Sequence, residues 1–390
     1  MAAPLRVLCA AVAAAAATAA AAAAACSSSL NCSGGLGACV AGACECAPPW
    51  TGATCATLDT SLPAAASRAN EGLYADPGGA WTWTASPVAD DSGRWHAFVD
   101  RFTNGCGVLH YCSNGEVAHA VADEMLGPYV FADLAIGARD GFFDSGAAND
   151  VTVRRLPNGS YALFYMGSSL AGAHPNCSVA YDPAEGDRSS RRIGVAVAAS
   201  PYGPWSRLPL PLLGPCAGPS CWDNEDVSNP APIFLDDGSV VMLYKGRGLR
   251  AGQHVGVAWA PALEGPWTRS AAPLLELGAS EDPWQWRAAD GVLHALLHNG
   301  PGAGADWGGF HAFSADRGRT WTSTGLAYTG AVTWSNKTQT VLARRERPQG
   351  VVDGAGRLIA LFNSAQACEP REDWGAACRS FSMAVPLPSG

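Results

Sequence analysis

The 390-residue chain repeats one pattern five times, and this repeat constrains the fold more than any other feature. Each copy opens with a small, polar or charged residue that is usually followed by proline, runs through a turn that contains glycine, and re-enters a strand rich in aromatic and β-branched residues. The five openings are Ser86, Asn149, Asn229, Asp282 and Arg347.

A second element follows most copies: an apolar strand and then Gly-Pro-aromatic. It occurs at residues 127–129, 203–205 and 265–267, with a looser copy at 318–321. Four short strands in each of five units predict an all-β fold, a five-bladed β-propeller over residues 70–388. A stacked solenoid is the alternative, but its open ends would need capping segments, which we do not find in the sequence.

Six of the 14 cysteines lie close together between residues 26 and 55: Cys26, Cys32, Cys39, Cys44, Cys46 and Cys55. Spacing alone does not choose among their possible pairings. So short a segment cannot bury enough apolar surface to fold unaided, so disulfides must stabilise it, at about 2–4 kcal/mol each. A zinc site is the alternative, but the paired Cys-x2-Cys spacing typical of zinc modules is absent.

Residues 44–55 resemble the closing half of an EGF-like domain, with a Cys-x-Cys step, the aromatic Trp50 and the turn glycine Gly52. The resemblance implies an EGF-like module at residues 26–56, able to contact a protein partner, with bridges Cys26–Cys39, Cys32–Cys44 and Cys46–Cys55. Calcium-binding modules of this type carry an acidic cluster before the first cysteine, where this chain has polyalanine. We therefore expect no calcium there.

Seven further cysteines follow this module. Local pairing would join Cys106 with Cys112, Cys216 with Cys221, and Cys368 with Cys378, and would leave Cys177 unpaired. Glycosylation sequons occur at Asn31, Asn158, Asn176 and Asn336.

The first 25 residues carry Arg6, then an apolar run that becomes polyalanine, which predicts a secretory signal peptide at residues 1–25. A membrane anchor is a weaker interpretation because alanine is only weakly apolar. A lipoprotein site at Cys26 would leave an odd number of cysteines in the module. We expect a secreted protein that does not insert into a membrane after the signal is cleaved.

The formal net charge is −9, and no run of basic residues occurs. Binding to nucleic acid or to an anionic membrane depends on clustered Lys and Arg, so the sequence argues against both partners.

In a propeller the first strand of each blade lines a central channel, so the five openings should meet. Asp150, Glu281 and Asp282 are the predicted catalytic residues, because glycoside hydrolysis needs one carboxyl to protonate the leaving oxygen and another to activate water or attack. The predicted substrate-binding residues are Trp83, Ser86, Asn149, Asn229, Trp284, Trp286, His298 and Arg347.

The X-Pro openings, the motifs at 280–284 (Ser-Glu-Asp-Pro-Trp) and 227–231 (Val-Ser-Asn-Pro-Ala), and the Gly-Pro-Trp ends resemble the five-bladed propeller glycosidases. These include glycoside hydrolase family 43 and its arabinanase, levansucrase and invertase relatives, and the resemblance covers about residues 70–385. It implies an aspartate base or nucleophile in the first blade, a second aspartate that orients substrate, and a glutamate acid. Asp282 matches the aspartate motif, but the first blade departs from it, with Ser86-Pro87 where the essential aspartate is expected.

These features predict a secreted carbohydrate-active protein, a glycosidase that acts on extracellular polysaccharide without a metal or other cofactor. The alternatives are a non-catalytic glycan-binding or matrix protein built on the same propeller, and a structural secreted protein with neither activity.

Overall fold

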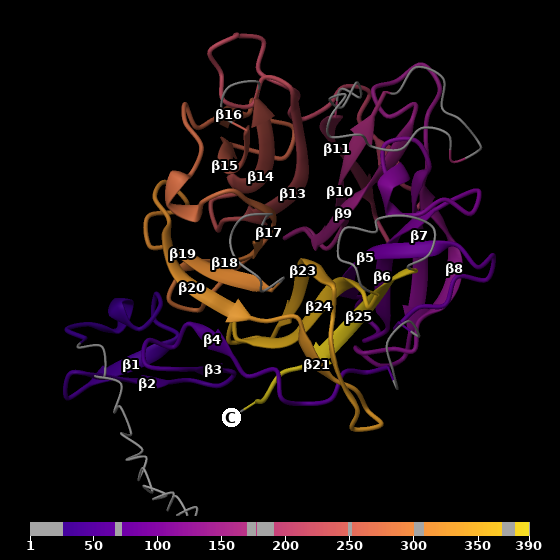
Figure 1. Ribbon diagram of the computed structural model, residues 1–390. Helices are drawn as coiled ribbons and strands as arrows, with labels where there is room; N and C mark the ends of the chain where they lie inside the picture. Colours follow the sequence, from indigo (N-terminus) through magenta and orange to yellow (C-terminus); the bar gives the residue numbers. More distant parts are fainter. Residues whose placement is uncertain are drawn as a thin grey trace, which may run out of the picture.

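The computed structural model describes residues 26–66, 72–169, 177, 191–248, 252–299, 308–368 and 379–389. The expected signal peptide lies outside these residues. Apart from three single 3-10 turns, the regular structure is β, and its strands form five blades around a centre (Figure 1).

Each blade is an antiparallel sheet whose strands follow one another in sequence. Blade I contains β5 (Trp81–Ala89), β6 (Trp95–Phe102), β7 (Gly115–Ala122) and β8 (Val130–Ile136). Blade II contains β9 (Ala147–Arg155), β10 (Tyr161–Ser168), β11 (Arg191–Ala198) and β12 (Ser206–Arg207). Blade III contains β13 (Asp226–Phe234), β14 (Val240–Gly248), β15 (Gly252–Ala260) and β16 (Thr268–Arg269).

Blade IV contains β17 (Ser280–Arg287), β18 (Leu293–Asn299), β19 (Gly309–Ser314) and β20 (Thr322–Tyr328). Blade V contains β23 (Arg344–Val352), β24 (Leu358–Gln366) and β25 (Ser380–Pro386). The first strands of the blades pack side by side in a closed ring, β5 against β9, then β13, β17, β23 and again β5. The predicted five-bladed propeller is therefore confirmed.

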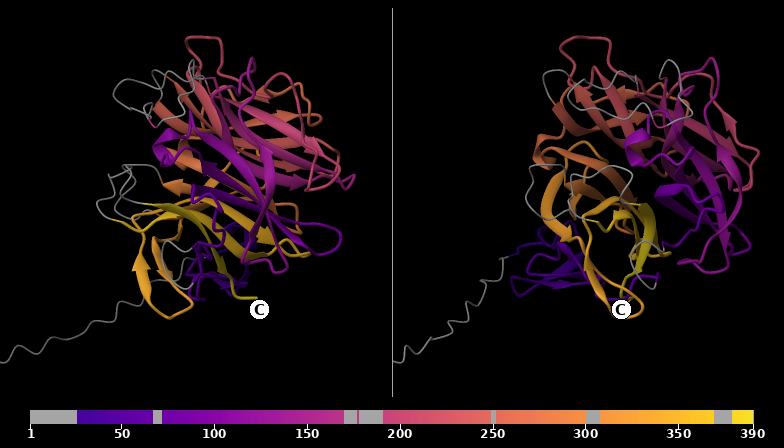
Figure 2. Two further views of the ribbon diagram at one scale, coloured as in Figure 1. Left: turned by 90° about the vertical axis from the view of Figure 1, so that its right-hand side faces the viewer. Right: turned by 45° about the vertical axis from the view of Figure 1, so that its right-hand side comes forward.

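The ring closes at blade V, where the segment before blade I adds to the outer edge of the last sheet. Ala65 N–H donates to Ala384 C=O and Leu73 N–H to Ser382 C=O, both at 3.0 Å. A hairpin of β21 (Ala331–Thr333) and β22 (Gln339–Val341) projects beside this edge (Figure 2). The two ends of the propeller chain thus share one blade.

A bulge interrupts the first strand of each blade near its start, and its position differs from the predicted blade opening in blades I and II. Asp150, Asn229, Asp282 and Arg347 occupy it in blades II to V, with φ of 55°, 51°, 55° and 49°. In blade I the bulge falls at residues 83–84.

Ser86 is therefore not the equivalent of the other openings, and Asn149 precedes its bulge by one residue. Ser86 lies deeper in the channel, where its hydroxyl donates to Gln349 Oε1 (3.2 Å) and accepts from Val153 N–H (3.0 Å). The prediction that Ser86 opens blade I was wrong because the bulge is set by strand register, and it lies before the Ser86-Pro87 pair.

A buried aspartate anchors the start of the first strand in blades II and III. In blade III Asp223 Oδ2 accepts from Tyr244 OH (2.9 Å) and from Arg269 Nη1 (2.6 Å). Asp144, Tyr165 and Arg207 make the same arrangement in blade II. Since an unpaired buried carboxylate is costly, each aspartate holds three strands of its blade together.

The N-terminal region consists of η1 (Ser29–Asn31) and the short strands β1 (Gly37–Val40), β2 (Ala43–Cys46), β3 (Trp50–Thr51) and β4 (Thr57–Leu58). It contains the bridges Cys26–Cys39, Cys32–Cys44 and Cys46–Cys55, the pairing that the EGF-like resemblance implied. This disulfide-rich region packs against blade IV (Figure 1).

Trp284 and Trp286 form that contact, so their predicted role as sugar-stacking residues is wrong. Trp286 is 3% exposed and stacks on Trp50, with ring centroids 6.2 Å apart. Trp284 also stacks on Trp286, with ring centroids 5.3 Å apart. Burial of these large rings fixes the N-terminal region on the propeller instead.

The remaining cysteines pair only partly as predicted. Cys216–Cys221 is present, but Cys106 bonds Cys177 rather than Cys112. The propeller brings the β6–β7 and β10–β11 connections together, which local spacing does not reveal. Cys368 is disulfide-bonded, and Cys378 lies outside the described residues.

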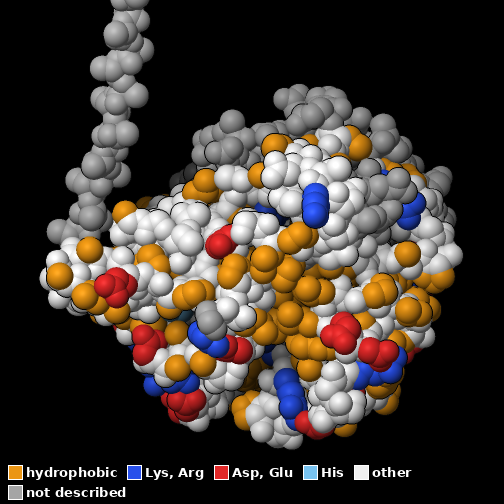
Figure 3. Space-filling model, turned by 90° about the horizontal axis from the view of Figure 1, so that it is seen from below, with side chains coloured by type: hydrophobic (Ala, Val, Ile, Leu, Met, Phe, Trp, Pro, Cys, Tyr) orange, Lys and Arg blue, Asp and Glu red, His pale blue; other side chains and the backbone are white. Residues whose placement is uncertain are grey.

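None of the described helical segments has the length and hydrophobicity needed to span a bilayer. Seen from below, hydrophobic side chains gather near the centre of one face, with acidic and basic side chains around them (Figure 3).

We expect Trp50→Ala to lower the free energy of unfolding by about 3–5 kcal/mol, because it removes a buried ring from the contact with Trp286. Urea denaturation followed by fluorescence measures the change. Leu30→Ala, at an exposed position of the same region, should change stability little. Equal effects of the two variants would show that the N-terminal region does not stabilise the propeller.

Candidate active site

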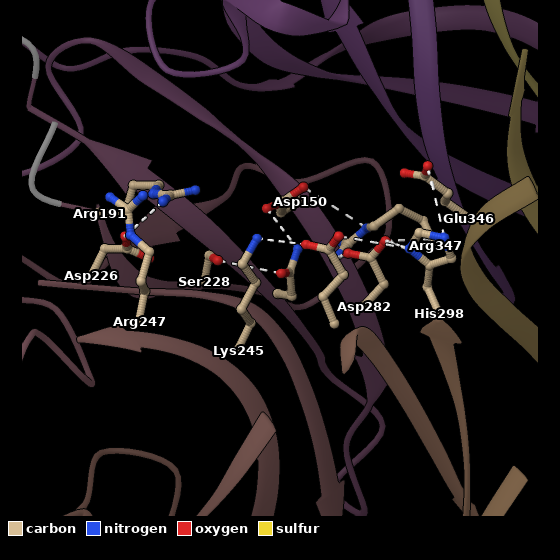
Figure 4. Close-up of polar contacts among 12 residues, drawn as sticks. Asp150, Arg191, Asp226, Ser228, Lys245, Arg247, Asp282, His298, Glu346 and Arg347 are labelled. Atoms are coloured by element: carbon tan, nitrogen blue, oxygen red, sulfur yellow. Dashed lines mark hydrogen bonds and ion pairs between the residues drawn. The ribbon is translucent and has the colours of Figure 1, made fainter. Parts of the chain in front are cut away.

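The bulged residues bring polar side chains from four blades to the mouth of the channel (Figure 4). A left-handed backbone conformation is uncommon for residues other than glycine and often marks a functional site. Asn229 Nδ2 donates to Asp150 Oδ2 at 2.9 Å, which joins blades II and III. The structure thus brings together four of the predicted site residues.

Arg347 lies at the centre of this group and is almost fully buried. Its Nε donates to Thr84 Oγ1 (3.0 Å) and lies 3.8 Å from Asp150 Oδ1. Its Nη1 and its backbone N–H donate to the two oxygens of Asp282, each at 3.3 Å. One guanidinium therefore links the first strands of blades I, II, IV and V.

Asp100 of β6 is a buried carboxyl of this site that the sequence analysis missed. Its two oxygens accept the backbone N–H groups of Asp150 (3.1 Å) and Val151 (3.3 Å). Burial, together with the charge of Asp150, raises the pKa of Asp100 to about 7, although Arg347 opposes the shift. A lone acidic residue within the apolar strand Trp95–Phe102 was the available signal.

Glu281 and Asp282 are adjacent carboxyls whose pKa values shift in opposite directions. Burial raises the pKa of Asp282 to about 7, with Arg347 opposing and Glu281 adding to the shift. Burial would also raise the pKa of Glu281, but Lys245, whose Nζ donates to Glu281 Oε2 at 2.6 Å, and His298 lower it well below its usual value. Near neutral pH, Glu281 is ionised while Asp282 retains a proton in a large fraction of molecules.

His298 of β18 connects the carboxyls of blades IV and V. Its Nδ1 lies 3.7 Å from Glu281 Oε1 and 3.9 Å from Asp282 Oδ2, and its Nε2 lies 3.8 Å from Glu346 Oε1. Burial would lower the pKa of His298, but Glu346, Glu281 and Asp282 raise it. His298 is thus a buried positioning residue, and Glu346 is a second carboxyl that the sequence analysis missed.

Asp282, His298 and Glu346 are also the residues best placed to hold a cation, since one ligand atom of each lies within 4.8 Å of the others. However, Arg344 Nη1 lies 2.8 Å from Glu346 Oε1, and Arg347 donates to Asp282. These guanidinium groups already neutralise the carboxylates and oppose a metal ion at the same place.

Solvent reaches only some of the predicted residues. The side chains of Glu281 and Asp150 are 18% and 15% exposed, whereas Asp282 is 6% exposed. Asn149 is buried, and its amide donates to Tyr111 C=O at 2.6 Å. The predicted substrate contact through Asn149 is therefore wrong, because its amide holds the β6–β7 connection.

Trp83 of blade I was predicted to bind substrate, and this prediction is also wrong. Trp83 is buried in a cluster with Phe102 and Val108 and presents no open ring face. Trp81 and Tyr111, which pack on the same cluster, remain partly exposed.

The wall between blades II and III carries a second charged cluster, seen at the left of Figure 4. Asp226 Oδ2 accepts from Arg191 Nη2 at 2.6 Å and lies 2.9 Å from Arg247 Nε. Arg191 Nη1 also donates to Tyr111 OH at 3.0 Å. This cluster ties the mouth of blade II to that of blade III.

No family model matches the sequence, and no curated protein matches it. The structure is similar to a family 117 glycoside hydrolase of the marine bacterium Zobellia galactanivorans, with a TM-score of 0.56, 15% identity, and coverage of 79% of this chain and 84% of that one. It is also similar to an endo-arabinase of Bacteroides thetaiotaomicron, with a TM-score of 0.51, 14% identity, and coverage of 80% and 95%. A thermostable family-43 glycoside hydrolase gives a TM-score of 0.50 at 14% identity, with coverage of 79% and 91%. At these identities the comparisons establish the fold.

We expect His298→Gln to destabilise the protein more at about pH 5.5 than at about pH 9. A raised pKa means that the folded state favours the protonated ring, so the stabilisation is present below about pH 6.5 and is lost as pH rises through the folded-state pKa. Urea denaturation at several pH values measures this difference. His254→Gln is the control, because its Nδ1 contacts the carbonyl of Gly278 on an exposed part of blade III; a pH-independent effect of His298→Gln would contradict the assignment.

Proposed function

We propose that the protein is a secreted glycoside hydrolase that acts on extracellular polysaccharide. The observation that carries this proposal is the pair of neighbouring carboxyls, Glu281 and Asp282, whose environments drive their pKa values apart at the mouth of the channel. Acid–base cleavage of a glycosidic bond requires one ionised and one protonated carboxyl around the scissile bond.

Each carboxyl has a distinct role in this proposal. Asp282, which retains a proton, donates it to the leaving oxygen, and Glu281, which is ionised and partly exposed, either takes a proton from the attacking water or attacks as nucleophile. Asp150, partly exposed and held by Asn229, accepts a hydrogen bond from a sugar hydroxyl. Arg347 positions Asp150 and Asp282 through its guanidinium.

Secretion is supported by the disulfides, because such bridges persist in oxidising compartments and are rare in the cytosol. The predicted signal peptide agrees with this compartment. The carbohydrate class is supported by the likeness to propeller glycoside hydrolases, one of which is named an endo-arabinase.

We expect Glu281→Gln to reduce kcat by about 10²–10⁴-fold on whichever aryl glycoside the protein cleaves, because the amide cannot act as base or nucleophile. The substrates to assay are aryl arabinosides, xylosides, galactosides and fructosides. Glu276→Gln, an exposed position in the segment before β17, is the matched control and should retain full activity. Unchanged rates in both variants would remove the site assignment.

We expect kcat/KM to fall as pH rises through about 7, because Asp282 must hold a proton to act as the acid and its pKa is raised to about 7. A pH–rate profile measures this limb. In Asp282→Asn the limb should disappear together with most of the activity; a profile that rises above pH 7 would show that Asp282 is not the acid.

Glycan binding without hydrolysis is the second candidate, and one observation favours it. Blade I places Trp83 and Thr84 at its bulge, so its first strand presents no carboxyl at the position where the resemblance to propeller glycosidases implied an aspartate. Calorimetric titration with arabinan or galactan fragments that shows binding, with no turnover of any aryl glycoside, would select this candidate.

A further inference from the structure

A separate pocket lies at the other end of the propeller, away from the mouth. It has a volume of about 540 Å³, within the range of small-molecule sites. Its lining comes from the far ends of β9, β13 and β17 and from the β9–β10 turn: Arg154, Arg155, Leu156, Pro157, Ile233, Phe234 and Gln285, with Gly159. The same strands carry Asp150, Asn229 and Asp282 at their opposite ends.

Arg154 is the distinctive residue of this pocket, because its charge is not neutralised. Its Nε donates to Pro232 C=O (2.9 Å) and its Nη2 to Gln285 C=O (2.7 Å), and its guanidinium lies 5.5 Å from the ring centroid of Trp284. Among the described residues it forms no ion pair. Burial lowers the pKa of Arg154 only to about 10, so the group stays positively charged at neutral pH.

The neighbouring arginines differ from Arg154 in this respect. On the same side of the propeller, Arg155 pairs with Asp91, Arg287 with Asp236, and Arg317 with Asp237. These carboxylates neutralise exposed arginines, whereas Arg154 is left with two carbonyl groups and the ring of Trp284. An uncompensated, partly buried cation favours an anionic ligand.

Gln285 adds a second unsatisfied group to the pocket. Its side chain is fully buried, and its Nε2 donates to the carbonyls of Ala231 (2.6 Å) and Val241 (2.9 Å). These bonds fix the amide, and its Oε1 is left buried without a hydrogen-bond partner.

We propose that this pocket binds an oxyanion, a carboxylate or a sulfate ester, carried by an acidic sugar. Arg154 Nε and Nη2 donate to carbonyls, whereas its Nη1 bonds no described residue and donates to the oxyanion. Phe234 and Ile233 pack against the apolar face of the sugar ring. This site does not depend on hydrolysis at the mouth.

The experiment is calorimetric titration of the folded protein with galacturonic acid, galactose 6-sulfate and galactose at one fixed ionic strength. The protein is first treated to remove N-glycans, because the sequon residue Asn158 lies in the β9–β10 turn beside the pocket. We expect one or both acidic sugars to bind more tightly than galactose, since the proposed mouth site also accepts neutral sugars. Arg154→Met should weaken that binding by about tenfold or more, and Arg287→Met, which removes a paired arginine, should leave it unchanged.

A charge-only pair of variants protects the test against loss of folding. Pro157 is exposed at the rim, so Pro157→Asp adds a carboxylate without disturbing Arg154, and Pro157→Asn is its neutral match. Pro157→Asp should weaken binding of the acidic sugars, and Pro157→Asn should not. Glu281→Gln should bind the acidic sugars as the natural protein does, which separates this site from the mouth.

Each outcome is informative about the ligand. Binding of galacturonic acid alone assigns a carboxylate, binding of galactose 6-sulfate alone assigns a sulfate ester, and binding of both assigns the shared oxyanion chemistry. Absence of binding in the natural protein, or binding that survives Arg154→Met and Pro157→Asp, overturns the proposal.

Discussion

The buried guanidinium of Arg347 is the interaction on which the channel mouth depends. It hydrogen-bonds Thr84 and Asp282, lies 3.8 Å from Asp150, and so joins four blades that share no backbone ladder with one another. A buried guanidinium without carboxylates would carry a large desolvation free energy, and the carboxylates without the guanidinium would repel one another. Each side of the cluster therefore makes the other stable.

The same cluster sets the protonation of the site. Three carboxyls, Asp100, Asp150 and Asp282, surround one guanidinium, so negative charge is in excess, and burial disfavours it further. Burial raises the pKa of Asp100 and that of Asp282 to about 7, with the charge of Asp150 adding to the first shift and those of Glu281 and Glu346 adding to the second. Glu281 escapes this effect because Lys245 and His298 supply positive charge on its other side. The contacts that close the ring thus also determine where the site holds a proton.

The repeat predicted the architecture well, because a propeller blade is specified by local turns and alternating strands. It did not predict which residue of each strand points to the axis. Proline follows the bulged residue in Asn229-Pro230, Asp282-Pro283 and Arg347-Pro348, but in blade II Val151 follows Asp150, and in blade I the bulge carries Trp83 and Thr84. The bulge is a property of register between two strands, which a motif in one strand marks only in part.

The site residues that the sequence did not reveal either lie on second strands or stand next to a predicted residue in the chain. Asp100 and Lys245 lie on β6 and β14, which an argument restricted to first strands leaves out. Glu346 had a usable signal, since Glu-Arg-Pro at 346–348 repeats Glu-Asp-Pro at 281–283. The tryptophans were misassigned because the sequence does not distinguish a ring exposed to a ligand from one that packs on another part of the same chain. Trp286, for example, stacks on Trp50, which is more than two hundred residues away in sequence.

The channel changes its chemistry along its length, and β9 shows how. Asp150 lies at the mouth, Thr152 bonds Gln349 in the middle, and Arg154 lies at the far end, each two residues from the next on one strand. Since side chains of a strand alternate in direction, residues 152 and 154 face the same way, and the bulge turns Asp150 toward the axis as well. At the mouth the guanidinium of Arg347 is surrounded by carboxyls, whereas the guanidinium of Arg154 at the far end forms no ion pair with a described residue. The strands β9, β13 and β17 therefore differ in charge between their two ends, and the two proposed sites rest on this difference.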